Sequence, residues 1–385
     1  ARCKEAVPLN ITLKTIGGRI LAAAKKDVIL TVSLVCAVFS MFLVPPSSAY
    51  IGYVDFRVLA LLFCLMVVVA GFQECGLFVL MARKLLSGEN NFRQLSWMLV
   101  MLPFFCSMLI TNDVALLTFV PFTILILDMI GEKKHMAWIV VLQTVAANLG
   151  SMATPVGNPQ NLFLYGRFSI PAGRFFAVLL PLAALSFVLL TAAVFRIPRI
   201  SMQIRFDAPE VTQEKHASPA VFLFLFLLCL LSVFRILDYR IALAVTVVCL
   251  LLFDRKLFRT ADYLLLLTFV CFFLFAGNMG QLQGLKSFMA EVLSRNPVLF
   301  SALTSQLISN VPAAVLLSGF TSDWKSLLLG TNLGGLGTPI ASLASLISLK
   351  FYIKELPDKV SHYLAVFTAI NIAFFLILYT AACFL

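Results

Sequence analysis

Apolar stretches long enough to cross a lipid bilayer recur along almost the whole chain. One helical crossing needs about 20 apolar residues. Spans of this kind are predicted near 28–44, 56–71, 136–165, 173–195, 218–234, 240–253, 262–278, 325–349 and 361–384. Because backbone groups in hydrocarbon must be hydrogen-bonded within the chain, each span is expected to be helical. The pattern therefore predicts an all-α polytopic membrane protein, with the lipid bilayer as its obligatory partner.

Composition excludes the soluble classes of protein. Of the 385 residues, 61% are apolar and 12% are charged, whereas globular domains are about 45–50% apolar and about 25% charged. So few charges cannot cover a soluble surface, so a soluble enzyme and a disordered chain are excluded. The net charge of +11 is assigned to cytoplasmic loops, and no nucleic-acid partner is expected. The nine cysteines include no C-x-x-C pair, so no metal cluster or disulfide framework is indicated.

The basic residues predict an orientation in the cytoplasmic (inner) membrane. With a cytoplasmic N-terminal segment 1–27, 21 of the 29 Lys and Arg residues fall on the cytoplasmic side and 8 on the other. This bias agrees with the positive-inside rule. The C-terminus is then expected on the extracytoplasmic side, and the linker 197–217 on the cytoplasmic side.

Two further apolar segments are divided in the middle by polar residues. The segment 94–130 is split at Thr111-Asn112-Asp113, and 297–318 is split at Ser309-Asn310. The second segment is too short for two crossings. Both are therefore predicted to be re-entrant helical hairpins whose tips stop near the middle of the bilayer, where surrounding protein buries them. The alternative, that these hairpins are ordinary spans, stays open.

An internal repeat relates the two halves of the chain. The pattern N-L-G-x-x-x-T-P occurs at 148–155 and again at 332–339, an offset of 184 residues. Upstream, the hairpin tips at Asn112 and Asn310 correspond. Further upstream, Asp55 and Asp262 each open a span that ends in Ala-Gly. Three matches in one order predict two structural repeats.

The repeat sets the predicted domain organisation, since the extra helix at 218–234 turns the second repeat over. Repeat 1 is predicted at 28–196, with a hairpin at 94–130 and a broken helix at 136–165. The linker 197–217 and the connecting helix 218–234 follow it. Repeat 2 is predicted at 235–385, with a hairpin at 297–318 and a broken helix at 325–349. Inverted repeats with broken helices that meet near the midplane are typical of secondary transporters.

The polar breaks are the candidate binding site. Gly and Pro inside a span interrupt its helix, which frees carbonyl oxygens for a small cation and exposes a half-helix N-terminus to an anion. The run 157–161 prolongs the first break with amide groups and is a further candidate lining of the site. The second half has Ala341 and Ser342 at the equivalent places. The alternative is that these side chains only pair helices by hydrogen bonds. The candidate substrate- and ion-binding residues are Thr111, Asn112, Asp113, Asn148, Ser151, Thr154, Gly157, Asn158, Ser309, Asn310, Asn332 and Thr338.

Asp113 is the one carboxylate that the predicted topology places at mid-membrane depth. An ionised carboxylate there is costly unless it binds a cation or takes up a proton. We therefore predict that Asp113 carries the coupling ion, and a role in capping the second arm of the hairpin is compatible with this. No organic cofactor is expected. The candidate ligands of a bound Na⁺ are Asn112, Asp113, Asn148, Asn310 and Asn332.

These motifs resemble the ion transporter superfamily of citrate-transporter-like permeases, arsenite permeases, sodium/proton antiporters and the melanosomal P protein. The segments 111–118, 153–161 and 309–312 carry the likeness, which is greatest to uncharacterised bacterial anion permeases. The resemblance implies a homodimer that works as an elevator, with a static scaffold at about 28–71 and 240–278. In the dicarboxylate/sodium branch, Ser-Asn-Thr hairpin tips bind sodium and carboxylate. Asp113 departs from that pattern and resembles the arsenite and antiporter branches.

The leading functional prediction is a secondary active transporter for a small anion or oxyanion, such as a carboxylate, coupled to Na⁺ or H⁺. A cation/proton antiporter and an arsenite or antimonite efflux permease are the alternatives. An intramembrane enzyme would need a nucleophile with its base, a metal site such as H-E-x-x-H, or paired carboxylates, and the sequence has none. A channel is disfavoured because inverted repeats imply alternating access.

Overall fold

The computed structural model describes residues 28–78, 81, 91–201 and 219–385, and these residues form helices and no β-strand. The predicted segment 1–27 and most of the linker 197–217 lie outside the described residues. The α-helices are α2 (Val28–Leu43), α3 (Ala49–Tyr53), α4 (Phe56–Glu74), α6 (Phe92–Cys106), α7 (Asn112–Met129), α8 (Met136–Ser151), α9 (Pro159–Arg167), α10 (Ala172–Val194), α11 (Pro219–Val233), α12 (Tyr239–Phe253), α13 (Tyr263–Met279), α14 (Gln283–Arg295), α15 (Pro297–Ile308), α16 (Asn310–Leu317), α17 (Trp324–Leu333), α18 (Leu343–Glu355) and α19 (Val360–Ala382).

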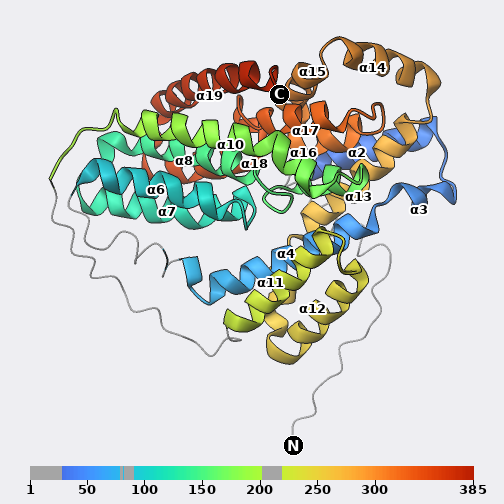
Figure 1. Cartoon of the computed structure of the whole chain (residues 1–385), viewed down its shortest axis with the longest axis horizontal. Coiled ribbons are helices and arrows are strands. Elements are labelled where there is room, and N and C mark those ends of the chain that lie inside the picture. The colour runs from blue at the N-terminus through green and yellow to red at the C-terminus, as the bar shows by residue number, and fades with distance from the viewer. Residues whose placement is uncertain (1–27, 79–80, 82–90, 202–218) are drawn as a thin grey trace, which may run out of the picture.

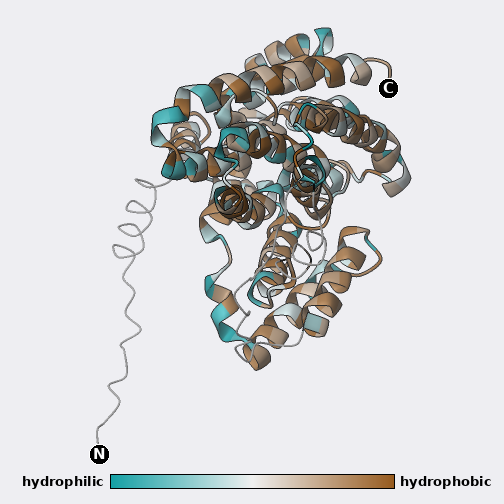
Figure 2. Cartoon of the chain, turned by 90° about the vertical axis from the view of Figure 1, so that its left-hand side faces the viewer, coloured by the Kyte–Doolittle hydropathy of each residue, from teal (hydrophilic) through white to brown (hydrophobic). Residues whose placement is uncertain are grey.

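Several of these helices have the length and apolar composition of a membrane span. In the described part of the chain these are α4, α7, α10 and the segment Pro357–Ala382, which contains α19. The helices α13 and α14, which are bent by 100° relative to each other, would make a fifth span if they are counted as one. The shorter apolar helices are α2, α6, α11, α12 and α15. Figure 2 shows that most helical surface is hydrophobic. The all-α prediction is confirmed, and the apolar helices fit a polytopic membrane protein.

Each of the four polar motifs lies where one helix ends and another begins. The breaks separate α6 from α7, α8 from α9, α15 from α16, and α17 from α18. Pro159 opens α9 with its fixed φ angle, and Ser309, at φ 73°, separates α15 from α16. The residues before α9 and α18, Asn158 and Ser342, have nearly the same extended backbone, with φ −141° and −142°. The path of these helices through a bilayer stays a prediction.

The two aspartates matched by the repeat act in the same way. Asp55 caps α4 by accepting a hydrogen bond from Val58 N at 3.0 Å, and Asp262 caps α13 by accepting one from Leu265 N at 2.9 Å. Each satisfies a backbone donor that the first turn of a helix leaves free. The inverted orientation of the two halves remains a prediction.

The helices form two groups, as Figure 1 shows. The smaller group contains α2, α3, α4, α11, α12 and α13, with α4, α11 and α12 set apart below the rest of the molecule. The larger group contains α6 to α10 and α15 to α19. The main contacts between the groups are those of α13 with α16 and of α4 with α9. The interface between the groups is therefore made of few helices.

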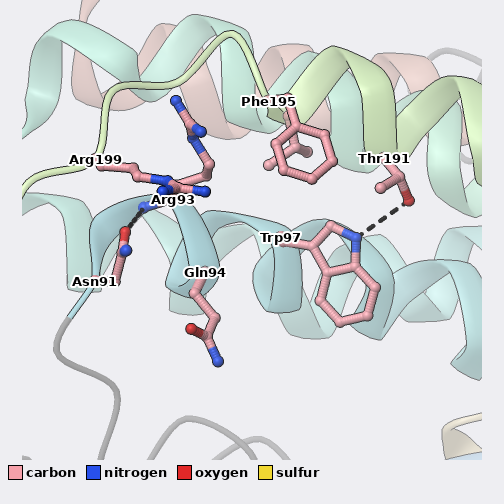
Figure 3. Close-up of a pocket in the computed structure, with 8 residues that line it drawn as sticks. Asn91, Arg93, Gln94, Trp97, Thr191, Phe195 and Arg199 are labelled. Carbon is pink, nitrogen blue, oxygen red and sulfur yellow. Dashed lines mark hydrogen bonds between the residues drawn. The ribbon is translucent and has the colours of Figure 1, made fainter.

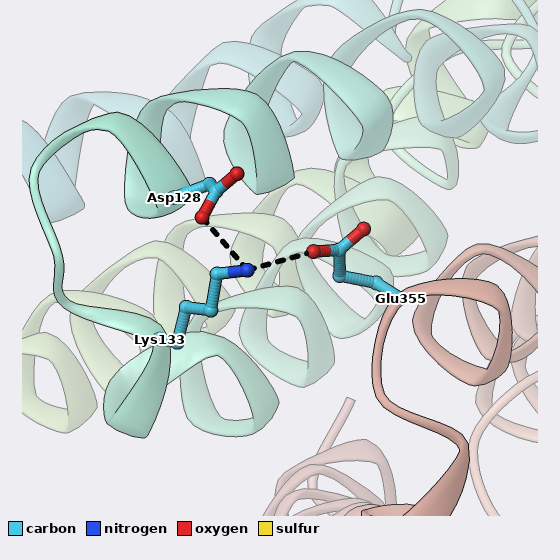
Figure 4. Close-up of polar contacts among 3 residues, drawn as sticks. All are labelled: Asp128, Lys133 and Glu355. Atoms are coloured by element: carbon cyan, nitrogen blue, oxygen red, sulfur yellow. Dashed lines mark hydrogen bonds and ion pairs between the residues drawn. The ribbon is translucent and has the colours of Figure 1, made fainter.

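The two predicted hairpins differ in size. The α7 arm has 18 residues, about 27 Å, whereas the α16 arm has 8 residues, about 12 Å. Beyond the end of α7, Lys133 lies 2.7 Å from Asp128 and 3.0 Å from Glu355 at the end of α18 (Figure 4). These two hydrogen bonds raise the pKa of Lys133. The ion pairs therefore hold the C-terminal ends of α7 and α18 beside each other.

Candidate substrate and ion site

Four helices begin at one small cavity. The first residues of α7, α9, α16 and α18 line it, and α13 of the smaller group closes one side. Its volume is about 20 Å³, which is room for about one water molecule or a monatomic cation. The residues from the four N-termini are Asn112, Asp113, Pro159, Gln160, Ser309, Asn310, Val311, Pro312, Ser342 and Leu343, and those from α13 are Leu265 and Thr268.

The electrostatics of this cavity favour an anion together with a cation. The N-terminus of each helix carries about half a positive elementary charge from its free N–H groups, and four such ends meet here. Among the residues that line the cavity, Asp113 is the one acid, and there is no basic side chain. Within the described residues, no three His, Cys, Asp or Glu side chains gather as a metal site. A bound cation would therefore be held by neutral oxygens and Asp113.

The two hairpin tips share one local arrangement. Asn112 Oδ1 accepts a hydrogen bond from Asp113 N at 3.0 Å, and Asn310 Oδ1 accepts one from Val311 N at 2.9 Å. Both asparagines are buried. Each side chain thus binds the helix terminus that it opens. Asn112 also donates from Nδ2 to Asn148 Oδ1 at 2.8 Å, which ties the first hairpin to the break between α8 and α9.

The two N-L-G asparagines link the halves of the chain to each other. Asn148 Oδ1 also accepts a hydrogen bond from Ser342 Oγ of the second half at 3.0 Å. Reciprocally, Asn332 Oδ1 accepts one from Asn158 Nδ2 of the first half at 3.5 Å, and Asn332 Nδ2 donates to Asn161 Oδ1 at 2.7 Å. Neither Asn148 nor Asn332 lines the cavity. Asn148 binds two residues of its wall, Asn112 and Ser342, whereas Asn332 binds the residues on either side of the lining pair Pro159 and Gln160.

The structure brings together four of the twelve candidate residues as lining of the cavity: Asn112, Asp113, Ser309 and Asn310. Asn148 is hydrogen-bonded to Asn112 of this lining, and Asn158, which precedes the lining residue Pro159, is hydrogen-bonded to Asn332. Thr111 is half-buried next to the tip asparagine and makes no capping hydrogen bond with its side chain.

The remaining candidates shape the breaks. Thr154 Oγ1 donates to the carbonyl of Met108 in the hairpin turn and accepts from Gly157 N. Gly157 is needed because an added Cβ would lie 2.2 Å from the Ser151 carbonyl oxygen. The Ser151 hydroxyl bonds to its own helix, at the carbonyl of residue 148. Thr338 is exposed, and its backbone N–H donates to Gln306 Oε1.

Gln160 is the most informative lining residue that the candidate set omits. Its side chain is 1% exposed, and neither Oε1 nor Nε2 has a hydrogen-bond partner among the described residues. Buried polar atoms are nearly always hydrogen-bonded. The Gln160 amide, which lines the cavity without such a partner, is therefore an exception. Gln160 belongs to the run 157–161, which the sequence predicts to prolong the break and to line the site, and the cavity wall contains Pro159 and Gln160 of that run.

Thr268 and Ser342 were also omitted. Thr268 lies on α13 inside an apolar run, in the part of the chain expected to be scaffold, and its single hydroxyl gave no pattern. Ser342 corresponds to Asn158 in the repeat, and that correspondence was the signal that could have included it.

Three of the helices at the small cavity, α9, α13 and α16, also line a larger cavity of about 450 Å³ toward their other ends. Arg57 and Arg167 line it together with one acid, Asp55, which forms no ion pair with either among the described residues. Its lining also includes the rings of Phe163 and Phe273, whose centroids are 5.5 Å apart. Phe163 follows Gln160 by one turn of α9, so these buried rings lie at the end nearer the small cavity.

Similarity to known proteins agrees with this architecture. Residues 19–321 match the family described as citrate transporter (CitMHS), a range that includes both hairpin tips. An uncharacterized transporter of Methanocaldococcus jannaschii is 31% identical over 77% of this chain and 81% of its own length. The inner membrane protein YbiR of Escherichia coli is 29% identical over 77% of this chain and 80% of its own. The silicon efflux transporter LSI3 of Oryza sativa subsp. japonica is 32% identical over 33% of this chain and 26% of its own.

Proposed function

Because this chain belongs to the citrate transporter family, it is a membrane transporter rather than an enzyme, and we propose that it moves a small anion or oxyanion coupled to Na⁺ or H⁺. The observation that carries this proposal is the meeting of four helix N-termini at one cavity whose single charged side chain is Asp113. Helix N-termini bind carboxylates and other oxyanions without a basic side chain.

Asp113 supplies the coupling in this proposal. An anion that enters the cavity is repelled by an ionised Asp113, so it binds well only when a cation or a proton has neutralised that carboxylate. By linkage, the anion raises the affinity for the cation by the same factor. Asn112 and Asn310, with amide oxygens at the same wall, are the candidate co-ligands of a Na⁺ ion.

The small volume of the cavity implies that loading requires a conformational change. A space of about 20 Å³ does not admit a carboxylate, so the hairpin tips must separate from the first turns of α9 and α18. We propose an elevator movement in which the larger helix group slides along the smaller. Its support is the narrow interface of α13 with α16 and of α4 with α9, and the arginine-lined cavity is the approach from one side.

The test is flux in proteoliposomes loaded with purified protein. Imposed gradients of Na⁺ or of H⁺ would be offered with radiolabelled citrate, dicarboxylates, arsenite and silicate. We expect gradient-driven uptake of at least one anion, its loss in Asn112→Ala, and its retention in Arg174→Gln, which removes an exposed charge far from the cavity. Absence of coupled flux for every compound would contradict the proposal.

A cation/proton antiporter is the second candidate, favoured by a cavity that fits only a bare ion beside Asp113. In the same vesicles, Na⁺ alone would then dissipate a pH gradient with no anion present. A metalloid efflux permease is the third, and the rice relative is named as a silicon efflux transporter. Transport of arsenite or silicate, with no carboxylate flux, would select it.

The membrane arrangement belongs to the same proposal. We place the chain in the cytoplasmic (inner) membrane with a cytoplasmic N-terminus, an extracytoplasmic C-terminus and two inverted repeats, working as a homodimer. Its support is the bias of basic residues and the name of the E. coli relative as an inner membrane protein.

A further inference from the structure

A cavity of about 380 Å³ lies between the first turns of α6 and the last turn of α10 (Figure 3). Arg93, Trp97, Phe195 and Arg199 are among its lining residues, and none of the lining residues is acidic. This cavity shares no lining residue with the substrate cavity. The cavity is therefore a separate feature of the fold.

Two tryptophans fix the depth of this cavity in the membrane. The indole N–H of Trp97 donates to Thr191 Oγ1 at 3.1 Å, and that of Trp138 donates to the Ala193 carbonyl at 3.3 Å. Both indoles therefore lie level with the last turn of α10, a helix long enough to span. Tryptophan concentrates where hydrocarbon meets the polar headgroups. The cavity thus lies at headgroup depth.

The arginines give the cavity its charge. Arg93 Nε donates to the Ile197 carbonyl at 2.6 Å, and its guanidinium carbon lies 5.7 Å from the centre of the Phe195 ring. These contacts fix Arg93 while other guanidinium N–H groups stay available. Arg199 is exposed at the same cavity. In the described part of the chain, neither arginine is in an ion pair with an acid.

We propose that this cavity binds the phosphate headgroup of an anionic phospholipid. Guanidinium groups present paired N–H donors that match phosphate oxygens, and basic pockets between helices at the membrane surface take anionic headgroups. The rings of Trp97 and Phe195 line the part of the cavity that the glycerol and upper acyl chains occupy. Because α6 leads to the tip at Asn112, a lipid bound here contacts the first hairpin at the start of α6, the end away from that tip.

Native mass spectrometry of the full-length protein tests this proposal. The protein would be purified in detergent and titrated with phosphatidylglycerol and, separately, with phosphatidylcholine. Arg199→Gln is the main variant because Arg199 is exposed and its loss leaves the fold intact. Arg174→Gln is the matched control, since it removes an exposed arginine from the first turn of α10, the end of that helix away from the cavity. Thermal melting checks that each variant is folded.

We expect phosphatidylglycerol to bind in preference to phosphatidylcholine, and Arg199→Gln to weaken that binding about fivefold while Arg174→Gln leaves it unchanged. Arg93→Gln should weaken it further in any preparation that melts normally. Equal binding by Arg199→Gln and Arg174→Gln would overturn the proposal. So would displacement of the lipid by millimolar inorganic phosphate, because the cavity would then be a site for free phosphate.

Discussion

At the scale of single residues, the cavity shows a conflict between stability and function at Gln160. An unsatisfied buried polar group costs about 1–3 kcal/mol, and both ends of this amide are unsatisfied. A residue kept only for packing would be apolar. The cost is understandable if the amide binds the transported ion or substrate during part of the cycle.

Gln160→Leu should therefore raise the melting temperature of the detergent-solubilised protein while lowering coupled flux at least tenfold. The matched substitution is Gln143→Leu on α8, because Gln143 Nε2 donates to the Leu99 carbonyl and to Thr123 Oγ1, so that only its Oε1 lacks a partner among the described residues. That variant should melt at a lower temperature. A destabilised Gln160→Leu protein would show that the amide has a structural role.

Asp113→Asn should abolish the dependence of uptake on an imposed ion gradient while leaving the protein folded, since asparagine keeps the size of the side chain and loses its charge. Asp238→Asn is the control, because Asp238 caps α12 on the surface and asparagine caps equally well. Flux of each variant would be measured with and without the Na⁺ or H⁺ gradient. Unchanged coupling in Asp113→Asn would remove this residue from the mechanism.

At the scale of elements, the positions of the helix breaks follow from local chemistry and were predictable. Proline is favoured as the first residue of a helix, and the polar tips needed buried partners, so Pro159 and the asparagine tips marked where new helices begin. The α14 helix and its 100° bend from α13 were not predicted, since that segment has short, mixed apolar runs. Thr268 was missed for a different reason: its role depends on the packing of α13 against elements distant in sequence.

The close contact of α6 with α8 depends on a glycine. An added Cβ at Gly150 would lie 2.0 Å from the carbonyl oxygen of Phe104, so Gly150→Ala should force the hairpin arm away from α8. We expect a loss of stability of about 1–3 kcal/mol, seen as a lower melting temperature. Gly173→Ala in α10 is the control, since nothing lies within 4 Å of its added Cβ. Equal melting of both variants would refute the tight contact.

At the scale of the whole molecule, membership of the transporter superfamily was predictable because the polar motifs are short, ordered and duplicated. The match over residues 19–321 confirms that prediction. The narrow interface between the helix groups was not readable from the sequence, because both groups are equally apolar. The substrate is not encoded by any one motif, since residues from five helices line the cavity.

Orientation can be measured with single cysteines in a cysteine-free background. Ser287 on α14 and Lys359 after α18 are both exposed, and the proposed topology places them on opposite sides of the membrane. In intact cells, an impermeant maleimide should label Ser287→Cys and spare Lys359→Cys, and should label both after lysis. The reverse pattern would invert the proposed orientation.

The hydrogen bonds between the two halves have a consequence for how the protein is made. Asn148 accepts a hydrogen bond from Ser342, which lies 194 residues later in the chain. At a synthesis rate of about 5–20 residues per second, that partner emerges about 10–40 s after Asn148. During this interval the amides of the first half lack the hydrogen bonds that the second half supplies.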